Sequence, residues 1–147
     1  MSDKAREKAF QDHILDELAS NGWLVGDSAH YDKERAIYPE DLIAFVQESQ
    51  PEGWQKYCKT YGENPERHLL DAAVRQLARS EGGTLWLLRN QIEDRGHRLK
   101  VASFKPDNDL NPELLTRYQT NRLRVVPELI YSPHGYDGRI DLTLFLN

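Results

Sequence analysis

The nine residues 139–147 constrain the fold of this chain more than any other segment does. They predict a β-strand, because hydrophobic residues alternate with other residues along the segment. One face of this strand would carry Ile140, Leu142, Leu144 and Leu146, and the other Asp141, Thr143, Phe145 and Asn147. So apolar a strand needs a partner, since an unpaired edge of this kind promotes aggregation. We therefore expect a sheet that is left incomplete at this strand.

The composition indicates one soluble globular domain over residues 1–147. Hydrophobic residues make up 39% of the chain and charged residues 29%, and the mean hydropathy is −0.73. No apolar run approaches the roughly 18 residues that span a bilayer, and the N-terminus predicts an amphipathic helix instead of a signal peptide. The single cysteine, Cys58, excludes an internal disulfide and a zinc site with several cysteines. We expect a cytoplasmic protein without a membrane partner.

The N-terminal half predicts helices. They cover residues 2–21, 39–50, 52–61 and a stretch from Asn64 to the glycines at 82–83, with Asn64 as a cap and Pro65 in the first turn. Phe10, Ile14 and Leu18 would form the buried stripe of the first helix. The segment 84–88 fits a short helix and a buried strand equally well.

The C-terminal half predicts strands at 98–104, 122–131 and 139–147, with one capped helix at 111–120. Residues 132–138 would form the loop between the last two strands. Pro127 indicates an edge or a bulge within its strand, because proline donates no ladder hydrogen bond. The fold class is therefore α+β, with a helical N-terminal half packed on an incomplete mixed sheet.

Several chemistries are excluded by missing motifs. The sequence holds no phosphate-binding G-x-x-x-x-G-K-[ST] loop and no G-x-G-x-x-G after a strand, which argues against ATP binding by this chain. The five histidines form no H-x-x-x-H pair, and a hydrolase of the G-x-S-x-G type lacks its nucleophile motif. The net charge of −5 argues against general binding to polyanions, although basic residues gather between Arg95 and Arg124.

Asp141 is the candidate for chemistry. Metal-dependent phosphodiester cleavage needs clustered carboxylates that hold a hard cation such as Mg²⁺, and a lysine near the attacking water. A frequent arrangement places one acid on a strand and a D/E-x-K motif on the next strand of the hairpin. The i, i+2 spacing puts that acid and lysine on one face of the sheet. Asp141 would be the first acid, and no E-x-K follows it in this sequence.

The chain resembles the N-terminal part of the R (restriction) subunit of type I restriction-modification enzymes. The matching pieces keep the family's order along nearly the whole chain. They are residues 10–18 with Asn21-Gly22-Trp23, Tyr31-Asp32, 41–46, 50–54, 83–85 with Leu88-Arg89, 104–106, Asn111-Pro112, Arg117-Tyr118, Asn121-Arg122 and 140–147.

This resemblance implies a restriction-endonuclease-like fold of the PD-(D/E)xK type, in which Asp141 is the catalytic acid and a Mg²⁺ ligand. It implies DNA cleavage far from the recognition site, with modification and specificity subunits as partners and ATP bound only by a motor domain that this chain lacks. The chain departs from the family by stopping before the E-x-K strand, and by Gln11, where many relatives carry a glutamate in the first helix. We expect this chain alone to be inactive.

For DNA contact we predict Arg122 and Arg124, which flank the strands that carry Asp141. Two other functions stay open. The chain could be a catalytically inactive interaction module that docks to the modification and specificity subunits. It could also be an unrelated small α+β binding protein, in which Trp23, Trp54 and Trp86 are core residues.

Overall fold

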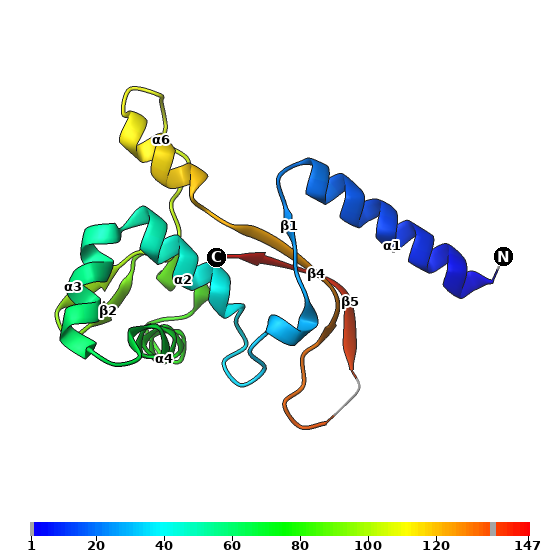
Figure 1. The fold of residues 1–147 in the computed structure, drawn as a ribbon, viewed down its shortest axis with the longest axis horizontal. Coiled ribbons are helices and arrows are strands. Elements are labelled where there is room, and N and C mark those ends of the chain that lie inside the picture. Colours follow the sequence, from blue (N-terminus) through cyan, green and yellow to red (C-terminus); the bar gives the residue numbers. More distant parts are fainter. Residues whose placement is uncertain (1, 136–137) are drawn as a thin grey trace. The chain divides into compact units, whose positions relative to one another are not determined.

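The computed structural model describes residues 2–135 and 138–147, and it is an α+β structure (Figure 1). The chain divides into two compact units. Unit 1 consists of Met1–Tyr38 and Arg122–Leu146, and unit 2 of Pro39–Asn121 and Asn147. Among the described helices, none is both long enough and apolar enough to cross a membrane.

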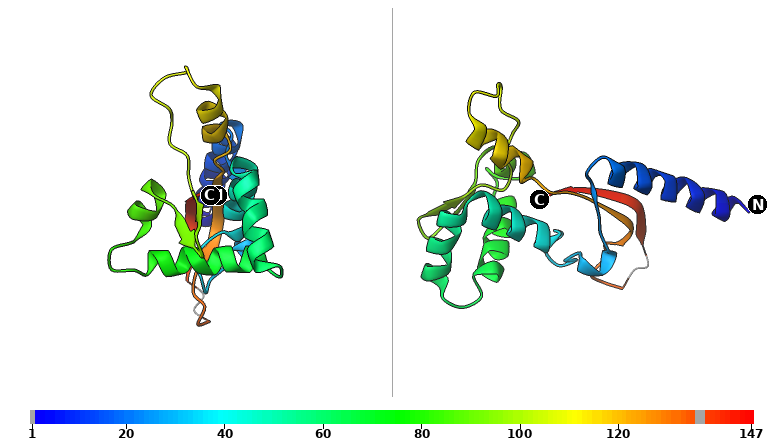
Figure 2. Two further views of the ribbon diagram at one scale, coloured as in Figure 1. Left: turned by 90° about the vertical axis from the view of Figure 1, so that its left-hand side faces the viewer. Right: turned by 45° about the horizontal axis from the view of Figure 1, so that its top comes forward.

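Unit 1 contains a mixed three-stranded sheet. Its central strand β4 (Leu123–Ile130) pairs in parallel with the short β1 (Leu24–Val25) and antiparallel with β5 (Arg139–Leu146). The two long strands confirm the predicted hairpin, and they run side by side in the right view of Figure 2. Part of the loop predicted at 132–138 lies outside the described residues. Among the described strands, β5 pairs with β4 alone, so its other edge is open.

The core of unit 1 lies on the Phe145 face of β5. Tyr38 packs there with Val126 and Leu129, and the rings of Tyr38 and Phe145 are 5.6 Å apart. The other face of β5 carries Ile140, Leu142, Leu144 and Leu146, and by its residues it is the more apolar of the two. This face is nevertheless largely exposed, with Leu144 at 58%. The reason is that the segment after β1, which includes the 3₁₀ turn Ser28–His30, brings its aromatic side chains to the Phe145 face.

Helix α1 (Asp3–Ser20) begins and ends where the sequence predicts. The Ser2 hydroxyl accepts a hydrogen bond from the Ala5 amide, and the helix stops at Asn21, before Gly22 with φ +90°. Phe10 was expected in the buried stripe, and this expectation is wrong, because its side chain is 66% exposed. The half-buried stripe is formed instead by Gln11, Ile14, Leu15 and Leu18.

Unit 2 is mainly helical. It contains α2 (Pro39–Ser49), α3 (Pro51–Tyr61), α4 (Pro65–Leu77), α5 (Thr84–Arg89), and a hairpin of β2 (Ile92–Asp94) and β3 (His97–Leu99). Segment 84–88, for which the sequence left a short helix and a buried strand open, is helical. The fully buried side chains of unit 2 include Phe45, Val46, Tyr57, Leu69, Ile92 and Leu99.

Asp94 joins three elements of unit 2. Its carboxylate accepts hydrogen bonds from the hydroxyls of Tyr57 (2.9 Å) and Tyr61, and it lies 3.4 Å from a guanidinium nitrogen of Arg75. Tyr57 and Tyr61 belong to α3, Arg75 to α4 and Asp94 to β2. The hairpin is therefore held to both helices through one acid.

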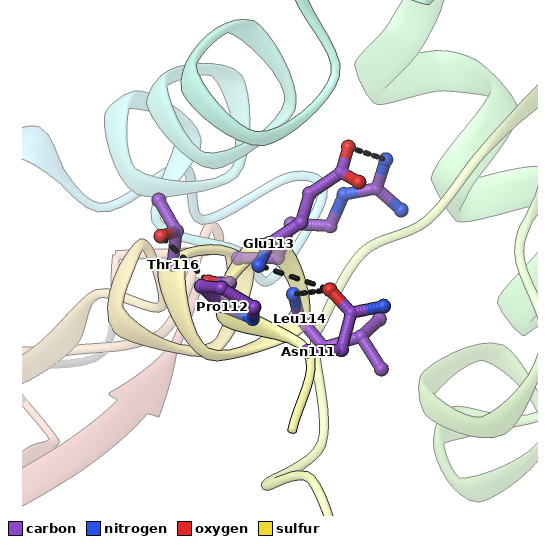
Figure 3. A network of polar contacts seen from close by, with 6 residues as sticks. Asn111, Pro112, Glu113, Leu114 and Thr116 are labelled. Atoms are coloured by element: carbon purple, nitrogen blue, oxygen red, sulfur yellow. Dashed lines mark hydrogen bonds and ion pairs between the residues drawn. The ribbon is translucent and has the colours of Figure 1, made fainter. Parts of the chain in front are cut away.

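Helix α6 (Pro112–Gln119) has the predicted cap. The Asn111 side chain accepts hydrogen bonds from the amides of Glu113 (3.0 Å) and Leu114 (3.4 Å), as Figure 3 shows. Asn64 behaves differently from the prediction. It precedes α4 in a left-handed conformation with φ +51°, and its side chain makes no capping hydrogen bond.

Candidate functional site

Asp141 is the third residue of β5 and lies across the hairpin from Glu128. The pairs on either side, Leu129 with Ile140 and Pro127 with Leu142, share one register, which sets Asp141 opposite Glu128. Both residues are exposed. Pro127 lies past the end of β1, so β4 has one partner strand there. Of the two readings predicted for Pro127, an edge or a bulge, the edge is confirmed, because the register with β5 continues without an extra residue. The next residue, Glu128, has φ +51°.

Gln11 links helix α1 to strand β5 at Asp141. The Gln11 amide nitrogen Nε2 donates a hydrogen bond of 2.9 Å to the backbone carbonyl oxygen of Asp141, 130 residues away in sequence. This bond uses the backbone of Asp141 and not its carboxylate. The carboxylate makes no hydrogen bond or ion pair with the residues that the structure describes. Helix α1 thus orients the strand at Asp141 while the acid stays available for a ligand.

Asp141 opens into a hollow of about 630 Å³ within unit 1. Helix α1 contributes Lys4, Glu7, Lys8, Gln11, Asp12 and Leu15, and the hairpin contributes Pro127, Glu128, Arg139 and Asp141. Seven of these ten residues are charged, four negatively and three positively, which leaves one net negative charge. A hollow with this balance attracts a cation, and it carries nearby positive groups for an anionic partner.

The donor chemistry of the hollow fits Mg²⁺. Within residues 2–135 and 138–147, no three His, Cys, Asp or Glu side chains are grouped so that they could hold a metal ion. Magnesium, however, usually keeps several waters and uses one or two carboxylates together with substrate phosphates. Asp141 and Glu128 supply two such carboxylates, and their oxygens are the hard donors that this ion prefers. The arrangement therefore fits an open magnesium site and not a closed structural one.

The two arginines predicted to contact DNA differ in their surroundings. Arg124 is 8% exposed, with its guanidinium 4.9 Å from the centre of the Tyr38 ring and its Nη1 donating a hydrogen bond to the Val25 carbonyl (3.4 Å). Arg122 is half-buried. Neither residue lines the hollow at Asp141. Burial leaves little of Arg124 within reach of DNA, so the prediction now depends mainly on Arg122.

Sequence reasoning missed most of the walls of this hollow. Glu128 gave no motif signal, although it directly follows Pro127, the position predicted to be an edge or a bulge. Lys4 and Lys8 are four residues apart and so share one side of α1 with Gln11, and the helical spacing could have identified them. Arg139 follows the loop at 132–138. Its place in the hollow could be inferred only from the pairing of β4 with β5.

A second hollow, of about 650 Å³, lies within unit 2. Its walls carry the cations Arg98, Lys100 and Arg117 and the acids Glu48, Glu52 and Glu113. The charges cancel, and one ion pair, Arg117 with Glu113 at 3.4 Å, lies in the wall itself. This hollow has neither the excess charge nor the strand-borne acid of the first one, so the Asp141 hollow is the stronger candidate.

Comparisons with protein-family models, with curated proteins and with solved structures found no match to this chain. Its function is therefore inferred from its own residues and their geometry.

Proposed function

We propose that this chain forms part of a Mg²⁺-dependent DNA-cleaving domain, in which Asp141 is a metal ligand, as in the R subunit of type I restriction-modification enzymes. The observation that carries the proposal is the hydrogen bond from Gln11 to the backbone of Asp141 in a charged hollow. It joins the first helix to the strand-borne acid, the two positions that the family resemblance singles out.

Each residue has a role that follows from its position. The Asp141 carboxylate holds the cation, and Gln11 orients the strand by its bond to the Asp141 carbonyl. Lys4, Lys8 and Arg139 line the same hollow and attract the phosphodiester backbone. A bound divalent cation would supply Lewis-acid stabilisation of the phosphate and a water nucleophile.

The charge of the hollow supports binding of the cation before the DNA. Without a metal ion its formal charge is negative by one, which disfavours a phosphate. A divalent cation would make the hollow positive by one, so metal would promote DNA binding. The open edge of β5 is where a neighbouring strand with an acid and a lysine at i and i+2 would pair beside Asp141.

The experiment is a cleavage assay on a protein in which this chain continues into an E-x-K strand. We expect Mg²⁺-dependent nicking of plasmid DNA, lowered by about 100-fold or more in Asp141→Asn, because a lost metal ligand removes several kcal/mol of transition-state stabilisation. Asp109→Asn removes an exposed acid of unit 2 and should cut at the normal rate. Equal cleavage by wild type and Asp141→Asn would show that the acid is assigned wrongly.

A second candidate function is docking to modification and specificity subunits. The observation that favours it is the exposed apolar face of the sheet in unit 1, with Val25 at 49%, Leu144 at 58% and Leu146 at 43% exposure. Calorimetric titration with the purified subunits separates the two proposals. A docking role predicts an affinity that Leu144→Lys lowers and that Asp141→Asn leaves unchanged.

A further inference from the structure

We propose that the solvent side of helix α1 is a self-association surface, on which the α1 helix of a second copy of this chain packs antiparallel. This inference goes beyond the proposed function and does not depend on the metal site. The surface, the α1 stripe, consists of Arg6, Phe10, His13 and Glu17. All four side chains are exposed.

Helix α1 has little packing of its own for its length. It is 18 residues long, yet none of its residues is buried. Residues 3–10 are all exposed, and in Figure 1 and the right view of Figure 2 this end of the helix runs past the strands of unit 1. Helices in proteins owe most of their stability to the packing of one face. A partner helix along the solvent side of α1 would add such packing.

Phe10 is the apolar centre of the α1 stripe. Its side chain is 66% exposed, and the half-buried residues of α1 lie on a different side of the helix. A phenylalanine ring gains free energy when it leaves water and packs against another ring. In the antiparallel pair, Phe10 of each copy packs against His13 of the other.

The spacing of the α1 stripe suits a helix as the partner. Steps of four, three and four residues join Arg6, Phe10, His13 and Glu17, and this alternation is the spacing of a coiled-coil seam. The stripe is also symmetric about the point midway between positions 11 and 12. A two-fold axis there places Arg6 opposite Glu17 of the second copy and Phe10 opposite its His13.

Charge selects the antiparallel direction. In that direction Arg6 of each copy faces Glu17 of the other, which gives two ion pairs across the contact. A parallel pair would instead set Arg6 against Arg6 and Glu17 against Glu17, and like charges in such positions are unfavourable. Neither side chain makes a hydrogen bond or an ion pair with any residue that the structure describes, so both are available.

The distribution of charge along α1 also favours an antiparallel partner. Residues 3–10 carry three cations and two acids, whereas residues 11–20 carry three acids and neither lysine nor arginine. This order opposes the helix dipole, which is stabilised by acids near the N-terminus and cations near the C-terminus. An antiparallel second helix sets the positive half of each copy against the acidic half of the other.

The contact is small, so the dimer should be weak. From Arg6 to Glu17 the helix rises by about 16 Å, and a single pair of helices over this length buries less than the roughly 1,200 Å² of a stable interface. We expect a dissociation constant of about 100 µM.

The test is sedimentation equilibrium of the full chain of 147 residues at concentrations up to about 1 mM. Wild type should show a monomer–dimer equilibrium. Arg6→Glu and Glu17→Arg should each weaken dimerisation about tenfold or more, because each change sets two pairs of like charges against each other. Lys8→Glu is the matched control, because Lys8 lies on the side of α1 that lines the hollow, and it should dimerise as wild type does. Circular dichroism checks that every variant keeps its helix content.

A 1:1 mixture of Arg6→Glu with Glu17→Arg should restore dimerisation, although neither variant pairs with itself. One copy then carries two glutamates on its stripe and the other two arginines, so both ion pairs form again. A mixture that stays monomeric overturns the antiparallel pairing, and a wild-type chain that stays monomeric at about 1 mM overturns the proposal. If Leu144→Lys abolishes association and the α1 variants leave it unchanged, the exposed sheet face of unit 1 is the contact, and the proposal is again overturned.

Discussion

Replacing Tyr57 by alanine is expected to lower the free energy of unfolding of unit 2 by about 3–5 kcal/mol, as for other fully buried aromatic residues. The Tyr57 side chain is 0% exposed and packs against the rings of Tyr61 and His97, with centroids 4.8 and 5.4 Å away. Its hydroxyl also donates to Asp94, which holds the β2–β3 hairpin to α3. Urea denaturation followed by circular dichroism measures the loss. A loss below about 1 kcal/mol would mean that this cluster does not stabilise unit 2.

Tyr57→Phe is the matched control, because it keeps the ring and removes only the hydroxyl. We expect a loss of about 1–2 kcal/mol, since Asp94 keeps the hydroxyl of Tyr61 as a donor. Burial, followed by the hydrogen bond to Asp94, raises the pKa of Tyr57 above its ordinary value of 10.0. The stability from a raised pKa is fully present below that value and is lost as the pH rises above it. Wild type should therefore destabilise more steeply than Tyr57→Phe above about pH 10.

Most helix ends were predicted well because they have local signals, but the fourth helix was predicted too long, since α4 ends at Leu77 and not at the glycines 82–83. The serine before α1, the Asn21–Gly22 stop and the Asn111–Pro112 start each act within a few residues of the helix they bound. The α+β class and the hairpin of β4 and β5 followed from the same local reading, since an alternating pattern needs no knowledge of distant contacts.

The strand predicted at 98–104 was too long, because it ends at Leu99. Beyond that point, side chains replace the neighbouring strand. Gln50 accepts from the Lys100 amide (2.7 Å) and donates to its carbonyl (2.9 Å), and Asn121 bonds both backbone groups of Ser103 in the same manner. The backbone groups of Lys100 and Ser103 are therefore bonded without a partner strand. No local pattern reveals that two distant amide side chains supply those bonds.

The candidate site was predicted only in part, for a similar reason. Asp141 was found from its strand, and Gln11 was noticed as a departure from a family pattern. The bond between them joins positions 130 residues apart. Glu128 was missed because a regular strand would place it on the same face as the buried Val126, and only the positive φ separates them. Positions where the backbone departs from its regular pattern escape prediction by periodicity.

Alanine substitutions should separate Arg122 from Arg124, which the sequence treats as equivalent. We expect Arg124→Ala to lower the free energy of unfolding of unit 1 by about 2–4 kcal/mol, because its buried stem and guanidinium both lose their contacts. The packing is tight, since a Cβ built at Gly26 would lie 2.7 Å from the Arg124 Cδ. We expect Arg122→Ala to cost less than about 1 kcal/mol, as its side chain is only half-buried. Thermal and urea denaturation of the two variants measures both losses.

DNA binding should show the opposite order. If Arg122 contacts a phosphate, Arg122→Ala should weaken binding to any duplex and reduce the slope of log affinity against log salt by about 0.9. Fluorescence anisotropy with two unrelated duplexes over a range of salt concentrations measures this slope. Arg124→Ala should leave the slope unchanged wherever the protein is still folded, because a guanidinium over the Tyr38 ring neutralises no phosphate. A reduced slope in folded Arg124→Ala would mean that Arg124 leaves the tyrosine to bind DNA, and that its buried position in unit 1 is one of two states.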